Sequence, residues 1–138
     1  MNITYSPIGI VHSPIKNVKD APRFFSISQV KGTIEIYPEF AQGLYKIDSE
    51  ESIIVLFHFH LSSNNYELIQ KKCTTAEAKG VFTLCSPKRP NPIGMSVLRL
   101  ERVENNILYV SNLDMVDETP VLDIKPFRHF KEFSLKVD

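Results

Sequence analysis

The chain is divided into short runs of β-branched and aromatic residues that are separated by turn-forming residues. Such runs are typical of strands, because these side chains pack well on a pleated surface. The region Met95–Leu113 predicts a hairpin, since Glu104, Asn105 and Asn106 form a turn signal between two apolar runs. The full set of expected strands is Ile3–His12, Val30–Tyr37, Ser52–His60, Val81–Cys85, Met95–Val103, Ile107–Leu113 and Thr119–Ile124.

Helical signals are few. Pro38–Ile47 predicts a short helix and Tyr66–Lys72 a single helical turn. Many short strands with little helix predict a mainly β fold, a small closed or partly closed antiparallel barrel that protects its sheet edges. A chain of 138 residues is the size of one domain, so residues 1–138 are expected to form a single barrel domain.

Hydropathy and the N-terminal sequence indicate the cellular location of the protein and the state of its cysteines. The longest apolar run, Ile53–Leu61, is far shorter than the roughly 20 residues of a membrane-spanning helix, so no membrane span is expected. The N-terminus lacks the pattern of an export signal, which predicts a cytoplasmic location. Cys73 and Cys85 are therefore expected to be free thiols.

The charges sum to zero but are unevenly placed. A neutral chain is not expected to bind nucleic acids indiscriminately, because such binding depends on many phosphate contacts. A local basic patch and an ordinary solvated surface are both compatible with the charges of residues 71–100. That stretch carries one acid, Glu77, and the cations Lys71, Lys72, Lys79, Lys88, Arg89 and Arg99.

Two connections are rich in proline, His12–Arg23 and Ser86–Gly94. Each proline fixes its own φ and restricts the preceding residue, so both loops are stiff. A stiff loop suits a preorganised ligand site, although the same composition also makes an ordinary tight connection between strands. Gly94 would let the backbone approach a ligand where a Cβ atom would clash.

Four acids fall within ten residues near the C-terminal part of the chain: Asp114, Asp117, Glu118 and Asp123. Aspartate at a turn is often a cap for backbone N–H groups, which is a sufficient role for Asp114 and Asp117. Asp123 lies inside an apolar run and needs a partner if it points inward. Lys125 or Arg89 could provide that partner.

Phe57–His60 ends a strand with two histidines on the same face. A catalytic zinc normally needs a third protein ligand, and none is evident, so no metal site is predicted. His60 is a better candidate for a ligand hydrogen bond or a general base. The five glycines never form a Gly-x-Gly pair, which excludes a Rossmann fingerprint and a phosphate-binding P-loop.

Longer motifs resemble a known family over Tyr5–Phe127. They are Gly80-Val81-Phe82, Ser86, Arg89–Gly94, Asp117 and Thr119–Pro126, together with Ile8–Pro14, Ala21-Pro22-Arg23 and Phe57–His60. These motifs are similar to those of the tRNA-methyltransferase O family. The resemblance implies a barrel-shaped, non-Rossmann methyltransferase that works as a homodimer and uses S-adenosylmethionine. It implies methylation of the N6 atom of N6-threonylcarbamoyladenosine beside the tRNA anticodon. Some relatives carry a further C-terminal domain, and this chain resembles the short form.

The resemblance also implies where the cofactor binds. The matching positions are Phe24, Phe25, Ser26, His60, Leu61, Cys85, Met95, Ser96, Asp114, Met115, Val116, Asp117, Glu118 and Thr119. Three of these places depart from the family pattern: Cys85 replaces an arginine, Glu118 replaces a glycine, and Phe24-Phe25 replaces a more polar stretch. A charge-assisted hydrogen-bond donor is lost at Cys85.

Removing a proton from the acceptor nitrogen would help methyl transfer, and the candidate bases are His60, Asp114 and Asp117. Lys88 and Arg89 are expected either to contact a substrate phosphate or carboxylate, or to pair with Asp123 or Glu118. The candidate substrate-binding residues are Arg23, Lys88, Arg89, Asn91 and Lys125. Two alternatives stay open, a methyltransferase acting on a small molecule and a non-catalytic adenosylmethionine-binding module.

Overall fold

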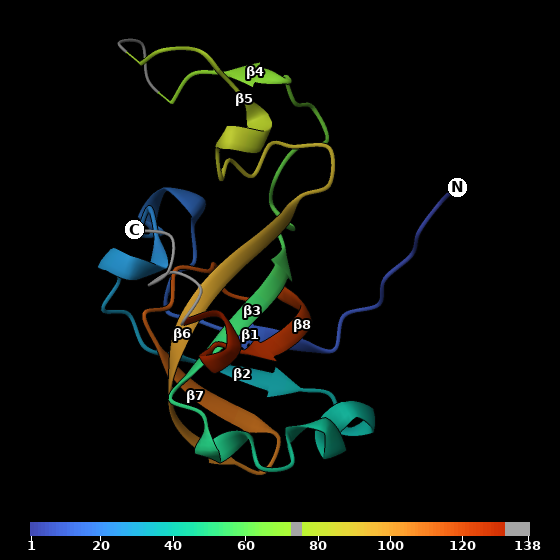
Figure 1. Ribbon diagram of the computed structural model, residues 1–138, viewed down its shortest axis with the longest axis vertical. Coiled ribbons are helices and arrows are strands. Elements are labelled where there is room, and N and C mark those ends of the chain that lie inside the picture. The colour runs from blue at the N-terminus through green and yellow to red at the C-terminus, as the bar shows by residue number, and fades with distance from the viewer. Residues whose placement is uncertain (73–75, 132–138) are drawn as a thin grey trace.

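The computed structural model describes residues 1–72 and 76–131. Six antiparallel strands close into a barrel in the order β1-β2-β7-β6-β3-β8, with β8 pairing back to β1 (Figure 1). The prediction of a mainly β, closed barrel is confirmed. The barrel strands are β1 Gly9–His12, β2 Gly32–Ile36, β3 Ser52–His58, β6 Ile93–Glu104, β7 Ile107–Ser111 and β8 Pro120–Pro126.

The other elements are short. β4 (Ile69–Gln70) and β5 (Lys79–Gly80) form a separate two-stranded sheet. The 3-10 helices are η1 Val18–Asp20, η2 Phe25–Ile27, η3 Pro38–Leu44, η4 Ile47–Ser49 and η5 Val81–Thr83. Among the described residues, no helix is long and apolar enough to cross a membrane.

Alternation along the strands fills the barrel interior with aliphatic side chains. Because successive residues of a strand point to opposite faces, every second residue of each strand faces inward. Together with Leu113 and Met115, which follow β7, these residues form one buried cluster. Its members from the strands are Val11, Ile34, Ile36, Ile53, Val55, Phe57, Leu98, Leu100, Leu108, Val110 and Val121.

The predicted hairpin is confirmed as β6 and β7, which pair from Glu104 and Ile107 onward. Asn105 has a φ of 55° in the two-residue turn, a conformation that asparagine tolerates better than most residues. The pairing shifts between Leu100 and Arg102, so a bulge divides β6 into two parts.

Some predicted elements differ from those observed. The first strand begins only at Gly9, and the segment Val81–Cys85 contains η5 instead of a strand. The turn predicted over Tyr66–Lys72 is wrong as well, since that segment contains β4, and the carbonyl of Leu68 accepts a hydrogen bond from Val81 N–H at 2.8 Å. The helix expected in Pro38–Ile47 is present as η3, of the 3-10 type.

Gly94 has a packing role that the sequence did not indicate. A Cβ atom at this position would lie 2.3 Å from Cζ of Phe57, its partner on β3. Phe57 is a buried member of the core, so its ring occupies the space that a side chain at position 94 would need. The absence of a side chain at Gly94 therefore serves the packing of the barrel.

The connection between β3 and β6 stands away from the barrel and carries β4, β5 and η5 (Figure 1). We call its described part, residues 61–72 and 76–92, the β4–β5 excursion. It is held together by Ser62 Oγ, which donates to Pro87 O at 3.2 Å, and by the bond from Val81 N–H to Leu68 O. Cys85 in this excursion is an exposed free thiol, whereas Cys73 lies outside the described residues.

Candidate functional site

Three of the predicted cofactor segments meet at the carboxylate of Asp114. Ser96 Oγ donates to Asp114 Oδ1 at 2.7 Å, and the backbone N–H of Phe25 also donates to this carboxylate. Ser96 is fully buried on the inner face of β6, while Asp114 is half-buried in the segment that follows β7. The barrel thus joins residues 25, 96 and 114, which the sequence places far apart.

The pKa of Asp114 is raised above its ordinary value. Desolvation is the largest cause, because burial disfavours the charged carboxylate, and the hydrogen bonds from Ser96 and Phe25 offset part of that effect. A carboxylate with a raised pKa is a stronger proton acceptor than an ordinary aspartate. Of the two candidate aspartates, Asp114 and Asp117, Asp114 therefore has the environment that better suits this role.

Residues 24–28 are fastened to residues 112–114 by further hydrogen bonds. Ser28 Oγ donates to the carbonyl of Leu113, and Asn112 Nδ2 donates to the carbonyl of Ser28 at 3.0 Å. The carbonyl of Val30 accepts from Leu113 N–H at 3.0 Å. Ser28 and Asn112 were not among the predicted site residues, because their partners lie more than 80 residues away in sequence and no local signal links them.

Asp117 holds the first proline-rich connection. Its carboxylate accepts from the backbone N–H of Ser13 at 2.9 Å and from Lys16 Nζ at 2.8 Å. The bond from Lys16 and then that from Ser13 lower the pKa of Asp117. Asp117 is thus a stabilised anion with an anchoring role, and a weak proton acceptor.

The residue after Asp117 stands in a turn with an unusual backbone conformation. Glu118 has a φ of 66°, in the left-handed region that favours glycine. Its backbone N–H donates to the carbonyl of Val11 at 2.8 Å, which fixes the turn against β1. The Glu118 side chain is exposed, and its backbone adopts a conformation that is less favourable for a residue other than glycine.

Most of the remaining predicted cofactor residues have side chains that are either buried or exposed, whereas Val116 and His60 are half-buried. Met115 and Thr119 are buried, with Thr119 Oγ1 donating to Val116 O at 2.6 Å, so they support the turn from within. Exposed side chains form the other group: Phe24, Ser26, Leu61, Cys85 and Met95. His60 is half-buried in the turn after β3, where the carbonyl of Pro92 accepts from the N–H of Phe59 at 2.8 Å.

Met95 and Ser96 point to opposite faces of β6. Met95 is 58% exposed on the outer face, whereas Ser96 faces Asp114 from within the barrel. Within one copy of the protein, the predicted cofactor side chains therefore do not all line the same site.

The predicted substrate residues are dispersed. Arg89 donates from Nη1 to the carbonyls of Leu84 and Ser86, at 2.9 and 3.3 Å, and so fixes its own loop. The partner of Asp123 is Lys125, at 2.7 Å, and not Arg89. The side chains of Arg23, Lys88 and Asn91 are exposed.

Histidines and acids do not gather into a metal site in residues 1–72 and 76–131. No group of three potential ligands is found there. His12 instead pairs with Glu35 at 2.9 Å across β1 and β2.

Comparison with known proteins matches residues 10–132 to the model of the tRNA-methyltransferase O N-terminal domain. A probable S-adenosyl-L-methionine-binding protein of Pyrococcus abyssi is 44% identical over 126 residues, covering 91% of this chain and 68% of that protein. The tRNA (adenine(37)-N6)-methyltransferase of Mus musculus is 35% identical over 135 residues, covering 91% of this chain and 31% of that enzyme. A crystal structure of TrmO from Pseudomonas aeruginosa matches with a TM-score of 0.79 and 33% identity, covering 96% of this chain and 59% of that chain.

The chain spans somewhat more than half of the solved Pseudomonas chain and about a third of the mouse enzyme. The match of the family model includes the Phe25–Ser96–Asp114 contacts and the turn at Asp117. The chain belongs to the tRNA-methyltransferase O N-terminal domain family.

Proposed function

We propose that this chain binds S-adenosylmethionine and transfers its methyl group to the N6 atom of N6-threonylcarbamoyladenosine beside the anticodon of tRNA. Membership of the family supports the reaction class, and the name of the mouse relative, a tRNA (adenine(37)-N6)-methyltransferase, supports the N6 atom of a tRNA adenine as the acceptor. The threonylcarbamoyl group on that nitrogen rests on the family resemblance alone. The observation that carries the proposal is the carboxylate of Asp114, held by Ser96 and Phe25 where three predicted cofactor segments meet.

The residues around this point fit the chemistry of the cofactor. A half-buried carboxylate and backbone amides suit its polar groups, and the partly exposed ring of Phe24 offers a face to its adenine. Leu61 and Met95, also in the predicted set, offer exposed apolar side chains. S-adenosylmethionine, when bound, supplies a methyl group that is already activated by its sulfonium sulfur.

The chain itself has to orient the acceptor and take up its proton. Holding the two reactants in line supplies much of the rate enhancement in such a transfer. We propose Asp114 as the proton acceptor, since burial raises its pKa, and His60 as the second candidate. For Asp117, also predicted to contact the cofactor, we propose a positioning role, which its bonds to Ser13 and Lys16 support.

We also propose that two copies form the working unit. The outer face of β6 carries Ile93 and Met95, which are 42% and 58% exposed, in an apolar strip beside Leu56 of β3. Apolar strips of this kind are typical of interaction surfaces. A second copy would also explain why predicted cofactor residues point to opposite faces of β6. Ile93→Glu should convert a dimer into a monomer in analytical ultracentrifugation, whereas Phe40→Glu on η3 should not.

Transfer of labelled methyl groups tests the function. Purified protein is incubated with methyl-labelled S-adenosylmethionine and either bulk tRNA or a metabolite extract. Label in the tRNA supports the proposal, and label in small molecules supports the alternative that the neutral net charge and Cys85 allow. Cofactor binding without transfer would identify a non-catalytic module, and no binding in calorimetry would refute the whole proposal. A cytoplasmic location stays a prediction.

A further inference from the structure

The β4–β5 excursion is more basic than the rest of the chain. Residues 61–92 contain five cations, Lys71, Lys72, Lys79, Lys88 and Arg89, against two glutamates, Glu67 and Glu77. Within the described part of the chain, none of the four lysines has a carboxylate within ion-pair distance. Cations left without acidic partners attract polyanions, and the effect is local because the whole chain is neutral.

A hollow of about 770 Å³ lies in this excursion, between the loop at residues 64–67 and the turn at residues 86–88. Gln70 joins the two walls, because its Nε2 atom donates to the carbonyls of Glu67 and Lys88, both at 2.7 Å. The hollow is therefore preformed. Its lining side chains are Asn64, Asn65, Tyr66, Glu67, Gln70, Lys71, Ser86 and Lys88.

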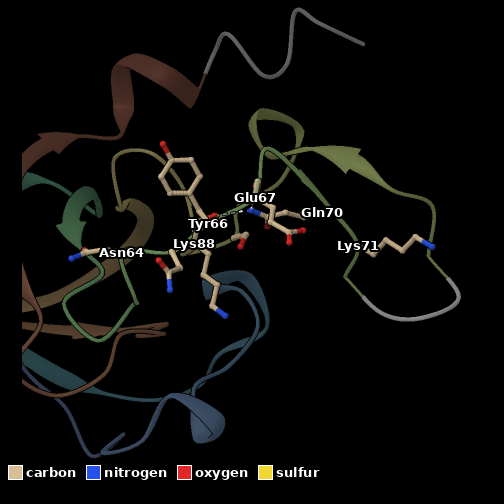
Figure 2. Close-up of a pocket in the computed structure, with 8 residues that line it drawn as sticks. Asn64, Tyr66, Glu67, Gln70, Lys71 and Lys88 are labelled. Carbon is tan, nitrogen blue, oxygen red and sulfur yellow. Dashed lines mark hydrogen bonds between the residues drawn. The ribbon is translucent and has the colours of Figure 1, made fainter.

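These side chains spread outward and do not converge. In Figure 2 the ring of Tyr66 and the ammonium group of Lys88 extend in opposite directions, and Lys71 is directed away from both. A small molecule is normally enclosed by convergent polar groups. One aromatic ring, amides and lysines that point in different directions suit an extended nucleic-acid strand, in which bases and phosphates follow one another.

The excursion also reaches the proposed cofactor site. Lys72 Nζ lies 5.4 Å from the ring centre of Phe24, which belongs to the predicted cofactor segment. A chain bound along the excursion would therefore lead toward the residues that we propose to carry out methyl transfer.

We propose that this hollow binds a single-stranded stretch of RNA that flanks the methylated nucleoside, an inference that rests on the proposed function. Tyr66, which is 45% exposed, stacks against a base, and Lys71 and Lys88 contact phosphates. Asn64 and Asn65 offer donors and acceptors to base edges. A contact with lipid would use exposed apolar side chains, such as those of Leu68 and Ile69. The amides that line the hollow favour RNA over lipid.

The test measures RNA binding by fluorescence anisotropy with a labelled hairpin that has an anticodon-like single-stranded loop. Tyr66→Ala should weaken binding about tenfold, as expected for the loss of one stacked base. Lys88→Gln should weaken it several-fold and reduce the slope of log affinity against log salt by about 0.7, the value for one phosphate contact on a single strand. Glu67→Gln should strengthen binding, because it removes a negative charge from the lining.

Matched controls lie between η3 and η4, at the end of the barrel away from the excursion (Figure 1), where Lys46 Nζ is 5.4 Å from the ring of Tyr45, itself 80% exposed. Tyr45→Ala and Lys46→Gln remove the same groups and should leave RNA binding unchanged. Melting curves from circular dichroism verify that every variant is folded. Calorimetry with S-adenosylmethionine should give wild-type affinity for Tyr66→Ala.

The inference is overturned if Tyr66→Ala and Lys88→Gln bind the hairpin as tightly as the wild type, or if the control variants lose as much affinity. It is also overturned if anionic vesicles, and not the hairpin, are bound in a way that depends on these lysines. These results differ from a failure of the proposed function, in which the wild-type protein itself neither binds the hairpin nor labels tRNA.

Discussion

Truncating Asp114 tests the central contact of the candidate site. Asp114→Ala removes the acceptor of the Ser96 hydroxyl, which has no exposed surface, and of the Phe25 N–H. A buried donor without a partner costs about 1–3 kcal/mol, and the half-buried Phe25 amide regains part of its bonding from water. We therefore expect a loss of about 2 kcal/mol in the free energy of unfolding. For a domain of this size that corresponds to roughly 8 °C in Tm.

A double-mutant cycle separates this contact from other effects of the truncation. Ser96→Ala alone deprives the Asp114 carboxylate of one donor and should cost about 1 kcal/mol. The double variant lacks both the Ser96 hydroxyl and the Asp114 carboxylate, so neither is left without its partner. Its loss in the free energy of unfolding should therefore be about 1 kcal/mol smaller than the sum of the losses of the two single variants. Urea unfolding followed by circular dichroism provides the measurement, since the chain has no tryptophan. Single effects that add to within about 0.3 kcal/mol would refute the coupling.

The raised pKa of Asp114 gives the same contact a pH dependence. Because its pKa is raised on folding, the protonated carboxyl of Asp114 favours the folded state. Its contribution to the free energy of unfolding is complete below the pKa of Asp114 in the unfolded chain and is lost as pH rises through the folded-state pKa. Asp114→Asn cannot ionise and does not follow this change. The stability of the variant relative to the wild type should therefore increase with pH across that interval, when unfolding is measured in buffers on both sides of it. A decrease would show that the pKa of Asp114 is lowered.

Further predictions concern the loops and turns around the site. Gly94→Ala should destabilise the barrel by about 1–3 kcal/mol in urea unfolding because its Cβ would overlap a core ring; Gly43→Ala, which meets no atom within 4 Å, should not. Glu118→Gly should be neutral or stabilising by up to about 1 kcal/mol, since it relieves a positive φ, and a clear loss of Tm would contradict this. Lys16→Ala should raise the pKa of Asp117 in an NMR titration, so that stability is lost at a higher pH on acidification; an unchanged pKa would show that Lys16 does not act on Asp117.

Most of the barrel was predictable because its signals are local. Period-two alternation and turn residues indicate a strand wherever they occur, as the confirmed hairpin at Asn105 shows. The segments Val81–Cys85 and Tyr66–Lys72 were predicted wrongly for the opposite reason. Their conformation depends on the bond between Val81 and Leu68, partners that short-range patterns do not relate.

The candidate site was predictable only as a set of segments. Motif resemblance indicated the positions of Asp114, Ser96 and Phe25, but which side chains contact each other depended on strand order. The role of Gly94 shows the same limit. Its motif was evident, but the ring of Phe57 that requires a glycine there comes from the neighbouring strand.

The sequence by itself determined the strand content, the stiff proline-rich loops and the family of the chain, because these follow from the residue types and their spacing. Only the tertiary structure decided that Asp114 is a half-buried carboxylate with a raised pKa and Asp117 an anchored anion. The two aspartates are three residues apart and chemically identical. Their properties differ because the fold buries Asp114, which raises its pKa, whereas Lys16 and Ser13 donate hydrogen bonds to Asp117 and lower its pKa.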